Sequence, residues 1–206
     1  MGSVQSPLLL LPVTKEDIPT CVDIWFKAFS KDKDMMQLFP DTPGMREWTA
    51  GYITLDLETK PYQYYVKVVD PEITDERGQA QILAYAKWDT ASIEVRGRRF
   101  PPWAEETPGD EATGVFDFLN GNRSRVMGDL KHYYLDMLCT HPDFQKRGAG
   151  SMLVKWGCDL ADKDGVSAYV DASKTGAPLY ERFGFVDRSL PDQGNIAAMG
   201  RFKKDP

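Results

Sequence analysis

The sequence predicts a single α/β domain over residues 1–206. Three patterns predict it: a short apolar run followed by a helical stripe, two runs of β-branched and aromatic residues divided by turn residues, and a strand, glycine turn, helix and second strand near the C-terminal end. A chain of 206 residues suits one domain with a sizeable buried core. We therefore expect one sheet flanked by helices.

The first expected elements are a strand over residues 8–13 and a helix that Thr14 caps. An apolar stripe at helical spacing marks the buried face of that helix: Cys21, Ile24, Trp25, Ala28 and Phe29. A second helix is expected over residues 43–57, with Trp48, Tyr52 and Leu55 on one face. These helices supply aromatic side chains to the core.

Residues 62–69 and 81–88 read as an antiparallel hairpin. Asp70-Pro71-Glu72, together with residues 75–78, is expected to form the turn between the strands. Residues 89–131 form the least regular part of the chain, with a helical segment expected over 112–127. This long insertion is either a lid over a binding site or a disordered surface segment, and the sequence leaves both open.

The strand over residues 133–140 leads into two glycines, Gly148 and Gly150, where the pattern changes from strand to helix. A helix N-terminus with such a turn leaves backbone N–H groups free to bind an anion, and a phosphate is the natural ligand. Lys146 and Arg147 add positive charge beside the turn. We expect the helix to run over residues 148–163, with Ser151, Leu153, Trp156, Cys158 and Leu160 partly buried.

Three phosphate-binding patterns compete for this turn. A Walker loop is excluded because no Lys-Ser or Lys-Thr follows either glycine. A dinucleotide-binding turn ranks second: Gly148, Gly150 and Asp171 fit its spacing, whereas Leu153 stands where a small residue is needed. The third pattern is Gln/Arg-x-x-Gly-x-Gly/Ala, which Gln145, Gly148 and Gly150 match.

Together with the later run Leu179-Tyr180-Glu181-Arg182-Phe183-Gly184-Phe185, the third pattern resembles the Gcn5-related N-acetyltransferase (GNAT) superfamily over residues 133–187. This resemblance implies the family's α+β fold: a mixed, mostly antiparallel sheet that splays between strands four and five and is flanked by helices. It also implies that acetyl-CoA is the co-substrate.

The resemblance assigns the acetyl-CoA contacts residue by residue. Its pyrophosphate would lie on the loop that comprises Gln145, Lys146, Arg147, Gly148, Ala149, Gly150 and Ser151. Its pantetheine arm would lie along the backbone of strand four at Leu138, Cys139 and Thr140. Many family members carry an asparagine six residues before the tyrosine of the late motif; Lys174 stands there in this chain, and the preceding Ser173 is the expected substitute.

Direct transfer to an amine needs a base, a polarised carbonyl and an acid for the departing thiolate. The resemblance makes Tyr180 the acid. For the base we expect Asp136, which shares a strand face with Tyr134 and would have a raised pKa in a partly apolar cleft. The other interpretation, a carboxylate neutralised by a neighbouring arginine, is left open. Cys139 is expected to be structural.

The resemblance thus predicts acetyl transfer to a primary amine of a small molecule. The alternatives are transfer to a protein N-terminus or lysine, and an acyl-CoA-binding sensor without catalysis. The net charge of −6 argues against nucleic acid, and the two histidines, His132 and His141, lack the spacing of a metal site. The odd number of cysteines and the lack of a signal or membrane-spanning pattern lead us to expect a cytoplasmic protein; its oligomeric state, a homodimer included, is left open.

Overall fold

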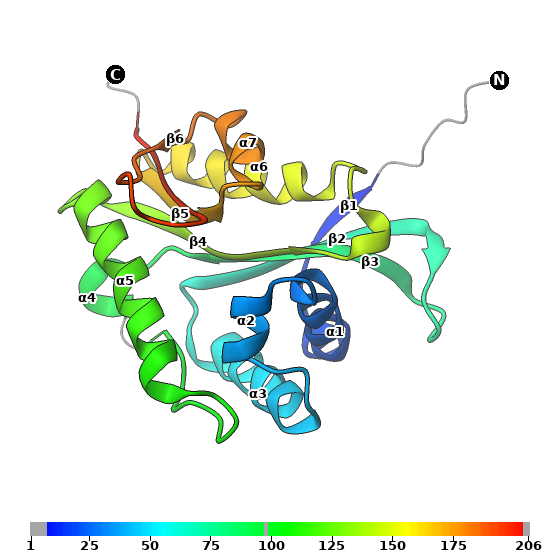
Figure 1. The fold of residues 1–206 in the computed structure, drawn as a ribbon. Coiled ribbons are helices and arrows are strands. Elements are labelled where there is room, and N and C mark those ends of the chain that lie inside the picture. Colours follow the sequence, from blue (N-terminus) through cyan, green and yellow to red (C-terminus); the bar gives the residue numbers. More distant parts are fainter. Residues whose placement is uncertain (1–7, 97–98, 204–206) are drawn as a thin grey trace.

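The computed structural model describes residues 8–96 and 99–203, which form a seven-stranded sheet between two layers of helices (Figure 1). The strand order is β1-β2-β3-β4-β5-β7-β6. The strands comprise β1 (Leu9–Pro12), β2 (Gln63–Thr74), β3 (Ala80–Asp89), β4 (His132–Thr140), β5 (Ser167–Ser173), β6 (Val186–Asp187) and β7 (Ile196–Arg201). All neighbours are antiparallel except β4 and β5, which are parallel.

Helices cover both faces of the sheet. In Figure 1, α1, α2 and α3 lie below it, α6 and α7 lie above it, and α5 crosses its left-hand end. The helices comprise α1 (Ile18–Phe29), α2 (Lys33–Leu38), α3 (Pro43–Thr59), α4 (Ile93–Arg96), α5 (Gly109–Met127), α6 (Ala149–Lys163) and α7 (Ala177–Glu181). Two 3₁₀ turns occupy Lys15–Asp17 and Pro142–Phe144. Among the described residues, no helix combines the length and apolarity that a membrane span requires.

The sheet opens between β4 and β5, as the sequence predicts. Their parallel pairing ends at Leu135 and Val170. Beyond it, residues 136–140 continue beside β3, and residues 171–173 continue beside β7. Each strand therefore has an open backbone edge that faces the gap.

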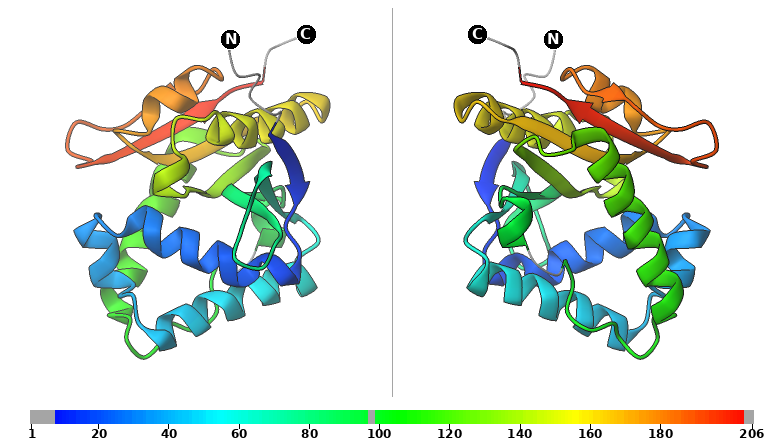
Figure 2. Two further views of the ribbon diagram at one scale, coloured as in Figure 1. Left: turned by 90° about the vertical axis from the view of Figure 1, so that its right-hand side faces the viewer. Right: turned by 90° about the vertical axis from the view of Figure 1, so that its left-hand side faces the viewer.

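The main helices agree with their sequence patterns, with shifted ends. The helix expected over 43–57 is α3, the helical segment expected within the insertion is α5, and the helix after the glycine turn is α6. Leu153 and Cys158 are buried in α6 as expected. The two views of Figure 2 show α5 as a single long helix beside the sheet.

The expected hairpin is present, but the predicted position of its turn was partly wrong. Strand β2 continues through Asp70-Pro71-Glu72 to Thr74, with an irregular register between Asp70 and Thr74. The turn lies only at residues 75–79, where the carboxylate of Asp75 accepts hydrogen bonds from the N–H groups of Arg77 and Gln79 at 2.9 and 2.8 Å. Proline interrupts the pairing locally without ending the strand because β2 has a bulge there.

Helix α6 is held against the sheet by close packing on Trp88, whose side chain is fully buried. A Cβ atom added at Gly157 would lie 2.0 Å from the indole ring, so only glycine fits. The indole Nε1 donates a hydrogen bond to the carbonyl of Leu153 at 3.2 Å. These contacts fix the position of the whole helix, and with it the turn at its N-terminus.

Candidate active site

The glycine turn before α6 has the backbone of an anion site. Lys146 and Gly148 have left-handed φ angles of 62° and 91°. The first N–H group that bonds back into the helix is that of Met152, to the Gly148 carbonyl at 3.1 Å. The N–H groups of Ala149, Gly150 and Ser151 thus have no partner within the helix and point out of its N-terminus, where the helix dipole favours a negative charge.

The charged side chains around this turn differ in part from the expectation. The Arg147 guanidinium forms an ion pair with Asp70, and this hydrogen bond holds the pKa of the Asp70 carboxyl below its usual range. Its charge is therefore matched within the protein, while Lys146 stays exposed. Arg182, at the end of α7, reaches the Ser151 hydroxyl at 3.3 Å and adds a cation that the sequence analysis did not single out.

The turn lies next to the open edge of β4. A Cβ atom at Gly150 would be 3.8 Å from both the Leu138 side chain and the Thr140 hydroxyl. The N–H of His141 bonds to the Leu83 carbonyl at 2.9 Å, and bonded positions alternate along an antiparallel pair. Leu138 and Thr140 therefore present their backbone groups to the gap.

By the same alternation, the backbone groups of Cys139 face β3, which disagrees with its expected place among the acetyl-CoA contacts. Its side chain is 1% exposed, and burial raises the pKa of the thiol well above its ordinary value. Cys139 is a core residue, consistent with the structural role expected of its thiol.

A cavity of about 220 Å³ extends the gap into the body of the protein. Strands β4 and β5 contribute Leu138, Asp171 and Ser173, and α7 contributes Tyr180. The far wall is aromatic and comes from three segments of the chain: Trp25, Phe29, Phe39, Trp48, Tyr52, Phe100 and Phe116. The cavity thus joins the open strand edge to a compact apolar chamber.

Tyr180, the acid expected from the sequence, lies at the wall of this cavity. Its side chain is 8% exposed and packs edge-on against Phe185, with ring centroids 6.0 Å apart. Burial raises the pKa of the phenol, so it is protonated at neutral pH. Among the described residues, none forms a hydrogen bond with its hydroxyl, which leaves the proton available to a bound molecule.

Asp136 does not have the environment expected of a base. Its side chain is only 4% exposed and pairs with Arg99 and, at 3.0 Å, with the Lys87 ammonium. Burial favours the neutral acid, but the two cations outweigh it and hold the pKa of Asp136 below its ordinary value. The expectation of a raised pKa was wrong, because β4 turns this carboxylate toward cations on neighbouring segments.

Asp171 has the environment that was expected of Asp136. It lies on β5 just beyond the last residue paired with β4, and burial raises the pKa of its carboxyl to about 6. The hydroxyls of Tyr169 and Tyr134 donate hydrogen bonds to its two oxygens at 2.6 and 3.3 Å. The sequence analysis considered Asp171 only as part of a dinucleotide site, and no local pattern announces its tyrosine partners.

Ser173 lines the cavity, but its hydroxyl forms hydrogen bonds with neighbouring residues of its own turn. Its hydroxyl accepts a hydrogen bond from the N–H of Gly176 at 3.1 Å and lies 3.1 Å from the Thr175 hydroxyl. It thereby stabilises the turn that leads into α7. No group of three or more His, Cys, Asp and Glu side chains in the described ranges is arranged to hold a metal ion.

Comparisons with known proteins agree with this architecture. A family model described as acetyltransferase (GNAT) domain matches residues 103–187. A curated protein of Stachybotrys chartarum described as acetyltransferase is 33% identical over 63 residues, which cover 29% of this chain but only 27% of that relative's length.

Three solved structures share the fold at low identity. The histone acetyltransferase HPA2 and related acetyltransferase from Corynebacterium glutamicum is 21% identical with a TM-score of 0.60, over 98% of this chain and 99% of that one. PaiA N-acetyltransferase from Thermoplasma acidophilum, solved with coenzyme A, is 10% identical with a TM-score of 0.58, over 96% and 99%. The C-terminal condensation domain of Ebony, solved with β-alanyl-dopamine, is 11% identical with a TM-score of 0.67, over 95% and 99%.

The observed fold contradicts the dinucleotide-binding alternative. Such domains have a mostly parallel sheet, whereas only one strand pair is parallel within residues 8–96 and 99–203. Four observations instead indicate an acetyltransferase (GNAT) domain. They are the glycine turn, the late Tyr180 motif, the sheet that opens between β4 and β5, and the family-model match. The described chain therefore has the fold of the Gcn5-related N-acetyltransferase superfamily, and residues 103–187 match that family's model.

Proposed function

We propose that this protein transfers an acetyl group from acetyl-CoA to the primary amine of a small molecule, in one complex that holds both substrates. The observation that carries this proposal is a single cavity lined by a protonated tyrosine, Tyr180, and by a carboxylate of raised pKa, Asp171, beside an open strand edge. These are the acid and the base that direct transfer needs.

The chain carries groups that would hold acetyl-CoA. The free N–H groups of Ala149, Gly150 and Ser151 would hold the pyrophosphate, and Arg182 stands beside them. The open backbone edge at Leu138 and Thr140 would pair with the amide groups of the pantetheine arm, as an added strand would. Acetyl-CoA supplies an activated thioester at the inner end of that arm.

Within the cavity, Asp171 accepts the proton that the attacking amine must lose, and its two tyrosine partners keep the carboxylate oriented. Tyr180 donates a proton to the departing thiolate from the other wall. The aromatic wall excludes water and holds the acceptor near both groups, so proximity supplies much of the rate enhancement. Asp136 stays paired with cations and serves as a fixed charge behind the site.

The enclosed acceptor side supports a small molecule over a protein acceptor. Phe39 and Trp48 from the N-terminal helices meet Phe100, Trp103 and Phe116 from the segment before and within α5, with ring centroids 5.0 to 6.2 Å apart. We infer that residues 99–116 act as a lid over this chamber. A protein N-terminus or a lysine would need an open groove at that position.

The test measures thiol release from acetyl-CoA with a panel of amines and basic peptides, for the wild type and Tyr180→Phe. We expect release that depends on a small amine, and a loss of about 10²- to 10⁴-fold in kcat in the variant with unchanged coenzyme A affinity, because only a proton donor is removed. Phenylalanine keeps the packing against Phe185, so the unfolding midpoint should not change.

Two outcomes would contradict this function. Release with peptides alone would assign a protein acceptor. Tight coenzyme A binding without release from any amine, in either protein, would indicate an acyl-CoA-binding sensor.

A further inference from the structure

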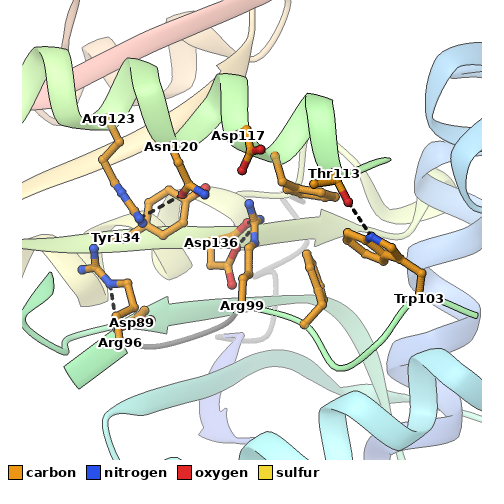
Figure 3. Close-up of a pocket in the computed structure, with 12 residues that line it drawn as sticks. Asp89, Arg96, Arg99, Trp103, Thr113, Asp117, Asn120, Arg123, Tyr134 and Asp136 are labelled. Atoms are coloured by element: carbon orange, nitrogen blue, oxygen red, sulfur yellow. Dashed lines mark hydrogen bonds and ion pairs between the residues drawn. The ribbon is translucent and has the colours of Figure 1, made fainter. Parts of the chain in front are cut away.

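A second cavity of about 280 Å³ lies between α5, the first half of β4 and the segment that begins at Arg99. Figure 3 shows Arg96, Arg99 and Arg123 around it, from α4, the following segment and α5. The two cavities share walls, since Arg99, Phe116 and Tyr134 line both. The two cavities are therefore adjacent, and the arginines lie next to the chamber beside Asp171.

Two of the three arginines have carboxylate partners. Arg99 pairs with Asp136, and Arg96 lies 3.3 Å from Asp89. Arg96 is 7% exposed, and its buried Nη1 makes no hydrogen bond in the described structure. This cation is therefore incompletely satisfied by its own protein.

Arg123 has no carboxylate partner among the side chains that the structure describes. Its guanidinium donates one hydrogen bond, to the Asn120 amide oxygen at 3.0 Å, and lies 4.5 Å from the centre of the Tyr134 ring. Asp117, which also lines the cavity, is exposed. Burial, together with the charges of Arg96 and Arg99, lowers the pKa of Arg123.

We infer that this arginine pocket, formed by Arg96, Arg99 and Arg123, binds a carboxylate of the acceptor, so that the acceptor is a compact amino acid whose amine enters the chamber beside Asp171. This inference rests on the proposed function and names its substrate class. A guanidinium presents planar, paired donors that match a carboxylate. One unmatched arginine balances one negative charge, which favours a carboxylate over a phosphate dianion.

The pocket also explains how an acidic protein handles an amine. Positive potential near the acceptor disfavours the ammonium form and favours the neutral amine that attacks. The neutral amine has no charge that the protein could attract. The carboxylate of the acceptor supplies the electrostatic attraction instead, to the arginine pocket. The aromatic side chains Phe100, Trp103 and Phe116 line the same cavity and favour an acceptor with an apolar body.

The experiment compares three matched acceptors: an aromatic amino acid, its amide and its decarboxylated amine. It uses the wild type, Arg123→Gln and the control Arg125→Gln, whose residue lies exposed two positions further along α5. We expect the wild type to prefer the amino acid by about tenfold or more in kcat/KM, the typical effect of a charge-assisted pair. Arg123→Gln should remove this preference through a higher KM, while Arg125→Gln should keep it.

A second readout is independent of turnover. Equilibrium binding of the N-acetylated amino acid should weaken about tenfold in Arg123→Gln, whereas binding of the N-acetylated decarboxylated amine should not change. Turnover of the decarboxylated amine at or above the rate of the amino acid would overturn the arginine pocket as a carboxylate site and leave the acetyltransferase standing. No turnover of any acceptor would overturn the proposed function, and this inference with it.

Discussion

Asp136 and Asp171 lie on the two arms of the open sheet and have opposite pKa shifts. Burial acts on both and raises the pKa of Asp171 to about 6. At Asp136, however, Arg99 and Lys87 lie in direct contact and outweigh burial. A carboxylate that cations neutralise cannot take a proton efficiently, so we propose Asp171, which tyrosine hydroxyls hold, as the base.

The first residue-scale prediction concerns Asp171→Asn and pH. The groups that face Asp171 are Tyr169 on β5, Tyr134 on β4, Arg99 and Arg123. A base works as its carboxylate, so the contribution of Asp171 to kcat/KM should rise as pH increases through about 6 and level off above it. Asparagine keeps the shape and cannot accept the proton, and we expect a loss of about 10²- to 10⁴-fold above pH 7.

The measurement is the ratio of wild-type to variant kcat/KM from pH 5 to pH 8, because the titration of the amine cancels in that ratio. The predicted ratio grows about tenfold per pH unit below the midpoint. A ratio that stays constant with pH would show that Asp171 only positions the substrate. Asp136→Asn serves as the comparison, and its ratio should show no midpoint near the value for Asp171.

At the scale of elements, the anion site depends on how α6 sits on the sheet. Gly157→Ala should destabilise the protein by about 1–3 kcal/mol, because the added methyl group meets the buried Trp88 ring. Urea unfolding measures this change. The matched control is Gly51→Ala in α3, where no atom lies within 4 Å of the added Cβ and alanine should stabilise by about 0.5–1 kcal/mol.

Equal changes in unfolding free energy for Gly157→Ala and Gly51→Ala would contradict the close packing of α6 on Trp88. If this packing also positions the glycine turn, Gly157→Ala should weaken coenzyme A binding while Gly51→Ala should not.

Elements with strong local patterns were predictable. Helices α3, α5 and α6 and the β2–β3 hairpin follow from apolar spacing and turn residues. The end of β2 was not predictable from the sequence. Pro71 suggests a turn, whereas pairing with β3 resumes at Thr74. Sequence patterns do not report a bulge that depends on the neighbouring strand.

At the scale of the whole molecule, the candidate site is assembled from distant segments. Tyr180 and the glycine turn were found because they lie in short motifs. Asp171 and Arg123 were not, because their chemistry comes from partners on other elements: tyrosines on two strands, and arginines gathered around one cavity. Tertiary packing decides which of several similar carboxylates keeps a raised pKa.

Direct transfer by Tyr180 and Asp171 in one cavity predicts a fixed product stoichiometry. Coenzyme A and the N-acetylated amine are measured together by mass spectrometry, with and without the amine. We predict equal amounts of both products, no coenzyme A release without amine and no acetylated enzyme. Stoichiometric coenzyme A release without amine, with the acetyl group left on a side chain such as Cys139, would contradict direct transfer.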